Sequence, residues 1–198
     1  DKIFEYDSLN NLVLIKGATL PSPRFLSSCT ENSQTNLIYC FGGYPHTDQI
    51  LEYNPFNDSA IIKSASLPSS RYGMSCTEDQ NTHLIYCFGG GGDLPSSFQN
   101  QILEYNSLTD VLLIKSTTLP VHTSTLSCDW NSIRNLVYCF GGFSGFGMLS
   151  GITRYDPLGN VVTETNLPLP DGIRSLSCVE NSLTHKTYCF GGFTINGH

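Results

Sequence analysis

Short apolar runs alternate with turn-forming residues along the whole chain. A typical run has about five residues rich in Ile, Val, Leu, Tyr and Phe, and Asn, Asp, Ser, Pro or Gly follows it. Runs of this length and composition are typical of β-strands joined by turns. No segment keeps the 3.6-residue periodicity of an amphipathic helix over a useful length. The pattern therefore predicts an all-β protein.

The runs recur in the same order four times. Each unit has an apolar strand that ends in Tyr, a turn, a second strand, and a link that contains Leu-Pro. A third strand and a glycine-ended fourth strand follow, and the fourth reads "LIYCFGG" in the first two units, then "LVYCFGG" and "KTYCFGG". Only the stretch between the Gly-Gly pair and the next strand changes in length. The sequence thus predicts four copies of one four-stranded unit.

Four-stranded units repeated every ~40–50 residues are typical of the blades of a β-propeller. We predict a single propeller domain over residues 1–198. The expected repeats are 1–43, 44–90, 91–142 and 143–192. If the ring closes, residues 193–198 join the first strands. The alternatives are that the repeats belong to a longer chain or combine with a second copy.

The eight cysteines follow the repeat, two in each unit and always eleven positions apart. Zinc sites usually contain C-x-x-C pairs, and none occurs in the sequence. An even count in register with a repeat indicates disulfides within hairpins, in an oxidising compartment. The alternative is four pairs of buried thiols. The predicted disulfides are Cys29–Cys40, Cys76–Cys87, Cys128–Cys139 and Cys178–Cys189.

These motifs resemble those of kelch-repeat β-propellers. The shared features are the Gly-Gly pair after an apolar strand, a Tyr followed by Asp or Asn, and Leu-Pro-x-x-Arg links at 20–24 and 67–71. The resemblance covers essentially the whole chain and implies kelch-like blades. A disulfide in every repeat indicates a secreted variant of that family.

Charge and composition exclude two classes of partner. The net charge of -7 provides no basic face for a nucleic-acid backbone. No run approaches the ~18 apolar residues of a membrane span. We therefore predict no nucleic-acid partner and no membrane span.

Residues with catalytic spacing are scarce. No His-x-His, His-Glu-x-x-His or Gly-x-Ser-x-Gly motif occurs, and no phosphate-binding loop is present. The resemblance admits copper-dependent enzymes of the galactose-oxidase type, which need a cysteine cross-linked to tyrosine. The predicted disulfides leave no cysteine for that role. We predict that the chain is not an enzyme and has no cofactor, with the copper oxidase as a distant alternative.

The variable stretches after the Gly-Gly pairs are the candidate binding loops. Variable loops on a rigid scaffold usually carry binding, and a propeller would gather these on one rim. Aromatic rings beside Gly and polar groups suit recognition of a protein or a sugar. The alternative is that the rings fold back over the blades. The candidate residues are Tyr44, His46, Asp93, Phe98, Phe143, Phe146, Met148 and Phe193.

A weaker candidate is the position two residues after the first cysteine of each unit. These positions are Glu31, Glu78, Trp130 and Glu180. On the innermost strands, three carboxylates would surround one mouth of a central channel and suit Ca²⁺. The alternative is that they lie at strand ends in solvent.

One N-glycosylation acceptor, Asn57 in Asn-Asp-Ser, lies in a predicted turn. Together with the disulfides it predicts an extracellular, secreted glycoprotein.

We interpret the chain as a non-catalytic extracellular module that binds or assembles through propeller loops. The expected partner is another protein surface, including further copies of the chain in a fibre or coat. The first alternative is a lectin-type propeller that binds carbohydrate.

Overall fold

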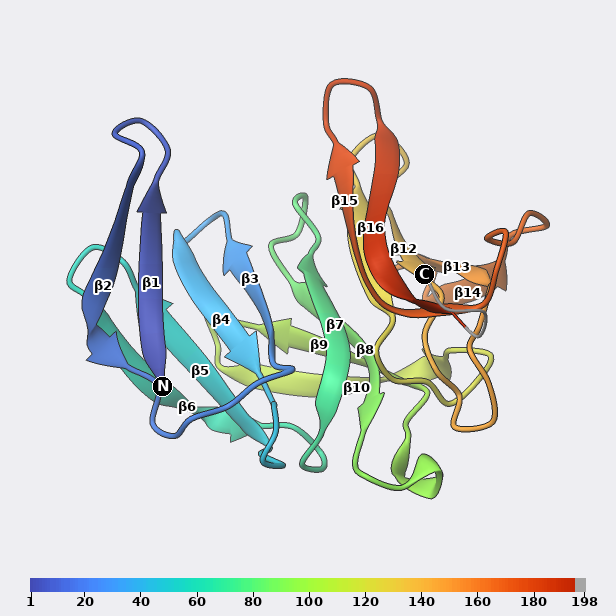
Figure 1. Cartoon of the computed structure of the whole chain (residues 1–198), viewed down its shortest axis with the longest axis horizontal. Coiled ribbons are helices and arrows are strands. Elements are labelled where there is room, and N and C mark those ends of the chain that lie inside the picture. The colour runs from blue at the N-terminus through green and yellow to red at the C-terminus, as the bar shows by residue number, and fades with distance from the viewer. Residues whose placement is uncertain (195–198) are drawn as a thin grey trace.

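The computed structural model describes residues 1–194 and is built from β-strands, with a short 3₁₀ turn, η1, at Pro95–Ser97 (Figure 1). The strands form three four-stranded and two two-stranded antiparallel sheets. The predicted all-β class and the antiparallel four-stranded unit are confirmed. Within residues 1–194, no helix is long and apolar enough to cross a membrane.

The sheets follow one another in chain order. The N-terminal two-stranded sheet contains β1 (Lys2–Asp7) and β2 (Leu12–Thr19). The first complete sheet contains β3 (Ser28–Asn32), β4 (Leu37–Phe41), β5 (Gln49–Asn54) and β6 (Ser59–Ser66). The second contains β7 (Tyr72–Glu78), β8 (Ile85–Gly91), β9 (Gln101–Asn106) and β10 (Val111–Thr118). The third contains β11 (Ser127–Asn131), β12 (Leu136–Phe140), β13 (Ile152–Asp156) and β14 (Val161–Glu164). The C-terminal two-stranded sheet contains β15 (Ile173–Asn181) and β16 (Lys186–Thr194).

Residues 1–194 do not form four complete blades in a closed ring, which is one of the arrangements that the repeats allowed. The Tyr strand, which comes first in each sequence unit, is the third strand of each complete sheet, so β1 and β2 match β5 and β6, while β15 and β16 match β3 and β4. The chain ends therefore hold two half-sheets, and the packing between sheets leaves them apart. The expectation that residues 193–198 join the first strands falls mainly on residues 195–198, which lie outside the described part.

The disulfides join the four predicted pairs, with Cα–Cα distances of 4.0–4.1 Å. In the first hairpin Cys29 faces Cys40, Thr30 faces Tyr39 and Glu31 faces Ile38, as the spacing predicts. Alternation of side chains with period two fixes this register once the cysteines face each other.

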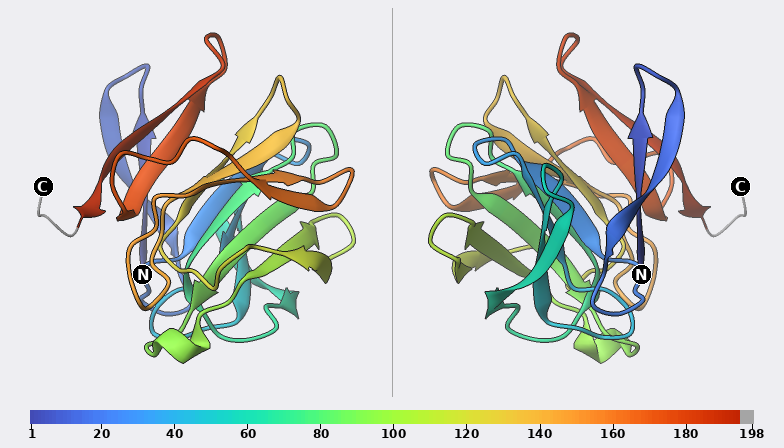
Figure 2. Two further views of the ribbon diagram at one scale, coloured as in Figure 1. Left: turned by 90° about the vertical axis from the view of Figure 1, so that its right-hand side faces the viewer. Right: turned by 90° about the vertical axis from the view of Figure 1, so that its left-hand side faces the viewer.

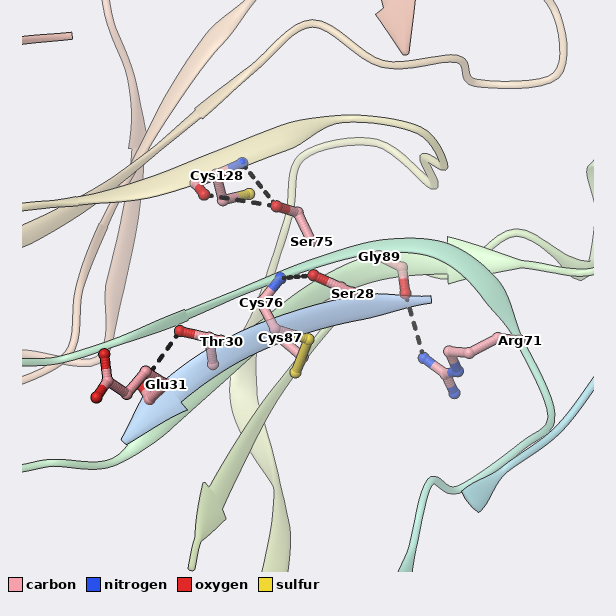
Figure 3. Close-up of a disulfide and its surroundings, with 9 residues drawn as sticks. All are labelled: Ser28, Thr30, Glu31, Arg71, Ser75, Cys76, Cys87, Gly89 and Cys128. Carbon is pink, nitrogen blue, oxygen red and sulfur yellow. Dashed lines mark hydrogen bonds between the residues drawn. A yellow bond between two sulfur atoms is a disulfide. The ribbon is translucent and has the colours of Figure 1, made fainter. Parts of the chain in front are cut away.

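Hydroxyl groups connect the inner strands of successive sheets. The amide of Cys76 donates to Ser28 Oγ at 2.9 Å, and the amide of Cys128 donates to Ser75 Oγ at 2.8 Å (Figure 3). In the first three units, the serine that precedes the first cysteine thus accepts a hydrogen bond from the next repeat. This link holds β3, β7, β11 and β15 side by side along the inside of the molecule.

The core consists of two clusters between successive sheets. The rings of Tyr39 and Phe41 each lie 5.6 Å from that of Tyr105. The rings of Tyr86 and Phe88 lie 5.4 and 5.7 Å from that of Tyr155 in the same edge-on arrangement. The "YCF" strands β4 and β8 therefore each pack their two rings on the repeated tyrosine of the following sheet.

The first glycine of each of the first three Gly-Gly pairs passes close to the next link. A Cβ atom on Gly42 would lie 2.3 Å from the carbonyl oxygen of Arg71, and one on Gly89 would lie 2.5 Å from that of Thr123. Both glycines also have φ near +60°. Glycine is required there because a side chain would meet both a strained backbone and a backbone oxygen.

Candidate functional site

The variable loops connect β4 to β5, β8 to β9 and β12 to β13, and they lie along the lower edge of the molecule in Figure 1. Because these loops leave equivalent strands, the repeat places them at one end. The shorter turns within β5–β6, β9–β10 and β13–β14 lie at the opposite ends of those strands. The predicted gathering of the loops is therefore present along three sheets.

One group of rings joins the first loop to the second sheet. The Tyr44 ring lies 5.0 Å from Phe25, 5.4 Å from His46 and 5.7 Å from Tyr72. The Tyr72 hydroxyl donates to Asp93 Oδ1 at 3.4 Å, and His46 Nε2 lies 3.6 Å from the same oxygen. Burial, together with the nearby Asp93 carboxylate, raises the pKa of Tyr72, which keeps it a hydrogen-bond donor. We call these five residues the tyrosine cluster.

A second group joins the second and third loops to the C-terminal hairpin. The rings of Phe98 and Phe143 lie 6.0 Å apart. The Arg174 guanidinium lies 5.0 Å from the centre of the Phe143 ring and 5.3 Å from that of Phe193, which is cation–π geometry. Phe98 is buried, whereas Phe193 is partly exposed. We call these four residues the phenylalanine cluster.

A shallow cavity of about 540 Å³ opens beside the phenylalanine cluster. It is lined by Leu94, Ser96, Phe98, His122, Ser144 and Phe146. The Phe146 side chain is 99% exposed, so its ring stands in solvent at the edge of the cavity. The exposed Phe146 ring and the shallow cavity together form a surface on which a partner can bury apolar area.

The structure brings most of the predicted loop residues together. Tyr44, His46 and Asp93 meet in one cluster, and Phe98, Phe143 and Phe193 meet in the other. Met148, also predicted, is half-buried near the end of the third loop, where its backbone bridges that of Phe143.

Sequence reasoning missed three members of these clusters. Phe25, Tyr72 and Arg174 lie on links and strand starts that precede the first cysteine, outside the variable stretches. Each contacts a ring from the loop of another segment. Their position in the sequence could have identified them, because all three residues lie close to the links that the Gly-Gly pairs approach.

The weaker candidates line one polar cavity of about 320 Å³ at the ends of the inner strands. Its acidic and aromatic residues are Glu31, Glu78, Asp129, Trp130 and Glu180. The three predicted glutamates and the tryptophan therefore line the same cavity. Among residues 1–194, however, no group of three or more metal-ligating side chains is arranged to hold a metal ion. Ca²⁺ binding remains an untested prediction.

Two of the three glutamates have protein partners. Glu78 Oε1 accepts a hydrogen bond from the Ser33 amide at 2.8 Å and lies 3.1 Å from His83 Nδ1. Glu180 accepts hydrogen bonds from the Asn131 side chain at 2.9 Å and from the Ser132 amide at 3.0 Å. Each of these carboxylates joins its sheet to the preceding one, which is a structural role.

The Asp129 carboxyl of this cavity has a raised pKa. Burial raises its pKa, although its carboxylate accepts hydrogen bonds from the Glu180 and Trp130 amides. The neighbouring Glu180 carboxylate raises it further. The cavity therefore disfavours additional negative charge.

Asn57 lies exposed in the turn between β5 and β6. Its Oδ1 accepts a hydrogen bond from Ser59 Oγ at 2.7 Å, which brings together the two residues that a glycosylation acceptor requires. The side chain is accessible to a modifying enzyme, and glycosylation remains a prediction.

Comparison with known proteins does not identify a family for this chain. No model of a known protein family matches the chain, and no curated protein matches its sequence. The kelch resemblance therefore depends on the motifs alone, and function has to be argued from the surface.

Proposed function

We propose that the chain is a kelch-like β-propeller module of an extracellular protein, and that it binds another protein through its variable loops without catalysis. Four disulfides support an oxidising, extracellular-type setting. The succession of antiparallel four-stranded sheets along the chain supports propeller-type blades. The Asn57 turn supports a glycoprotein.

One observation carries the binding proposal, namely that loops of different sheets combine into shared aromatic clusters. The tyrosine cluster unites two loops and a strand start, and the phenylalanine cluster unites two loops and the C-terminal hairpin. Each has aromatic rings beside a charged group. Aromatic residues with Arg are the usual anchors of protein interfaces. Since the loops differ between sheets, the resulting surface is asymmetric and selects one partner orientation.

Carbohydrate recognition is the second candidate. It is favoured by the tyrosine cluster, where the Tyr44 ring lies beside the His46 ring and His46 lies beside the Asp93 carboxylate. An aromatic face with adjacent hydrogen-bonding groups suits a sugar ring. A copper-dependent oxidase ranks last because every cysteine is in a disulfide.

The test replaces residues 91–101 with the six-residue loop Tyr-Pro-His-Thr-Asp-Gln of the preceding unit. Folding should persist because the length of a surface loop has little effect on closure entropy. The probes are a phage-displayed peptide library and a panel of immobilised glycans. We expect the natural chain to select peptides and the loop-swapped chain to lose them.

A matched pair of point variants sharpens the test. Phe146→Ser alters the loop surface, whereas Leu158→Ser alters a β13–β14 turn residue that is equally exposed, at 98% against 99%. Peptide binding should fall only in the Phe146 variant. Loss in the Leu158 variant alone would place the site on the opposite end, and selection of glycans without peptides would favour the lectin alternative.

A further inference from the structure

The two half-sheets each have an edge that lacks a neighbouring strand. In residues 1–194, β1 pairs with β2 and β16 pairs with β15, with no strand on the other side of β1 or of the Lys186–Phe190 part of β16. The matching strands of the complete sheets, such as β4 and β5, pair with each other. An exposed edge of this kind is a template for adding another strand.

The exposed edges carry residues that are buried everywhere else in the repeat. Tyr6 is 62% exposed, whereas its counterpart Tyr105 is 0% exposed. Phe190 is 65% exposed, and its counterpart Phe88 is 0% exposed. The half-sheets therefore present core residues to solvent.

An apolar groove of about 380 Å³ lies beside β1, and its lining residues correspond to residues that form an interface between sheets elsewhere in the chain. Its lining includes Cys29, Ile38, Cys40, Leu51 and Tyr53. The matching residues of the second complete sheet are Cys76, Ile85, Cys87, Leu103 and Tyr105. Those are covered by Tyr39 and Phe41, whose counterparts on β16 are Tyr188 and Phe190. The groove thus fits the two rings that β16 exposes.

A second groove, of about 360 Å³, lies beside β16 and fits the opposite end of the chain. Tyr138, Phe140 and Thr187 line it. In the two preceding interfaces the corresponding pair of rings packs on Tyr105 or Tyr155. The counterpart of that tyrosine in the N-terminal half-sheet is Tyr6.

The polar groups of the edges are also complementary. In the first complete sheet Glu52 accepts hydrogen bonds from both Lys63, at 2.8 Å, and the Tyr39 hydroxyl, at 3.1 Å. In the N-terminal half-sheet Glu5 accepts one from Lys16 at 2.8 Å, and the matching tyrosine, Tyr188, lies on β16. Half of this small network therefore lies at each end of the chain.

We propose that a second copy of this chain supplies the missing strands, with β1 of one copy pairing antiparallel with β16 of the other. The register of the complete sheets places Phe190 opposite Ile3, Cys189 opposite Phe4, Tyr188 opposite Glu5 and Thr187 opposite Tyr6. This proposal rests on the proposed protein-binding function, with a second copy of the chain as the partner. The second copy binds through the sheet edges and not through the variable loops.

The arrangement of the ends favours a second copy over the chain's own opposite end. Figure 1 shows β1–β2 and β15–β16 separated along the long axis, and Figure 2 shows both on the same flank. Joining them within one chain would disturb interfaces whose aromatic residues are already buried. A copy that faces this flank across a twofold axis meets both edges at once, each copy giving its β1 to the other's β16.

The experiment is sedimentation equilibrium of the intact, disulfide-bonded chain over a range of concentrations. We expect a concentration-dependent dimer. Phe190→Glu and Tyr6→Glu should each weaken self-association by at least about 100-fold, because each removes a buried anchor from both interfaces of the dimer. Phe56→Glu, at an exposed residue of the β5–β6 turn, is the matched control and should leave the dimer unchanged.

Mixing the two variants tests the head-to-tail pairing. A mixed dimer keeps one natural interface, between β1 of the Phe190 variant and β16 of the Tyr6 variant, so mixing should restore part of the association. Thermal unfolding checks that each variant folds, which the exposure of both residues supports.

The outcomes separate this proposal from the loop-binding function. A chain that stays monomeric at all concentrations would overturn the dimer proposal. If Phe190→Glu also lowered the melting temperature of that monomer, the chain would be covering its own β16 edge. Self-association that depends on Phe146 and not on Phe190 would also overturn the proposal. Phe146→Ser should leave the dimer intact even where it abolishes peptide binding.

Discussion

The second complete sheet and the two half-sheets contain corresponding strands of the repeat in different surroundings. "ILEYN" forms β9 and "IFEYD" forms β1, and both are regular strands. Yet the tyrosine is 0% exposed in β9 and 62% exposed in β1. Local sequence therefore determines the strand, whereas the neighbouring sheet determines whether the strand belongs to a core.

The link arginines show the same contrast between the middle and the end. Arg71 is buried and donates hydrogen bonds to Ser69, Gly89 and Gln101, and burial lowers its pKa to about 10. Arg24 donates to Ser22 and Gln49, and its Nε and Nη1 atoms have no partner within the described residues. The terminal repeat has the motif without its full set of contacts.

The largest expected difference between the two regions concerns the repeated tyrosine. Tyr105→Ala should lower the free energy of unfolding by about 4 kcal/mol, because it leaves a cavity between two sheets. Tyr6→Ala, at an exposed position, should lower it by less than about 1 kcal/mol. Urea unfolding of both variants at a concentration that keeps the chain monomeric measures the difference. Equal losses would mean that β1 is already covered.

The disulfides should separate the regions by accessibility. Removing a bridge with Cys76→Ala and Cys87→Ala should cost roughly 3 kcal/mol, since each bridge closes a short loop. The same cost applies to Cys178–Cys189, which has the same spacing. However, Cys189 is exposed and Cys87 is buried.

Under a limiting phosphine, Cys178–Cys189 should therefore be reduced before Cys76–Cys87. Alkylation followed by peptide mass spectrometry gives the order. Reduction of Cys76–Cys87 first would contradict the assigned burial.

A smaller difference should come from the Glu–Lys–Tyr contacts. Glu104→Gln weakens bonds from both Tyr86 and Lys115, at 3.0 and 2.6 Å, in a partly buried site. We expect a loss of about 2 kcal/mol. Glu5→Gln, where the carboxylate is more exposed and accepts from Lys16, should change stability far less. Thermal unfolding of the two variants side by side tests this contrast.

The smallest expected effect is the pH response of Asp129. Its folded-state pKa is raised by burial, so the folded state binds the proton more tightly than the unfolded state. The natural chain should therefore gain stability relative to Asp129→Asn as the pH falls from neutral through that raised pKa. Urea unfolding of both proteins at neutral and acidic pH gives the comparison, and a gain in the opposite direction would contradict the burial.

Much of the local structure was predictable from the sequence. Period-two alternation and paired cysteines specify a hairpin register, which is why the facing of Thr30 with Tyr39 follows from Cys29 and Cys40. The sequence left open whether the ring closes, and residues 1–194 form no closed ring. Closure depends on the angles between sheets. No local pattern of strands and turns determines those angles.

The candidate site was predictable only in part, for a related reason. Tyr44 and His46 stand in a visibly variable loop, but their partner Tyr72 belongs to the next repeat and precedes a constant strand. A contact between repeats appears only when the packing of the sheets is known. Arg174 was missed for the same reason, because the Phe143 and Phe193 rings that it contacts come from two other segments.

Amide hydrogen exchange across a concentration series is the most direct test of the contrast between the complete sheets in the middle of the chain and the half-sheets at its ends. At the lowest concentration, amides of β8 and β9 should exchange slowly, while those of β1 and the Lys186–Phe190 part of β16 should exchange quickly. As concentration rises, β1 and β16 should become protected together and β8 should not change. Full protection of β1 and β16 at the lowest concentration would contradict the account, because it would show that a single chain completes its own last sheet.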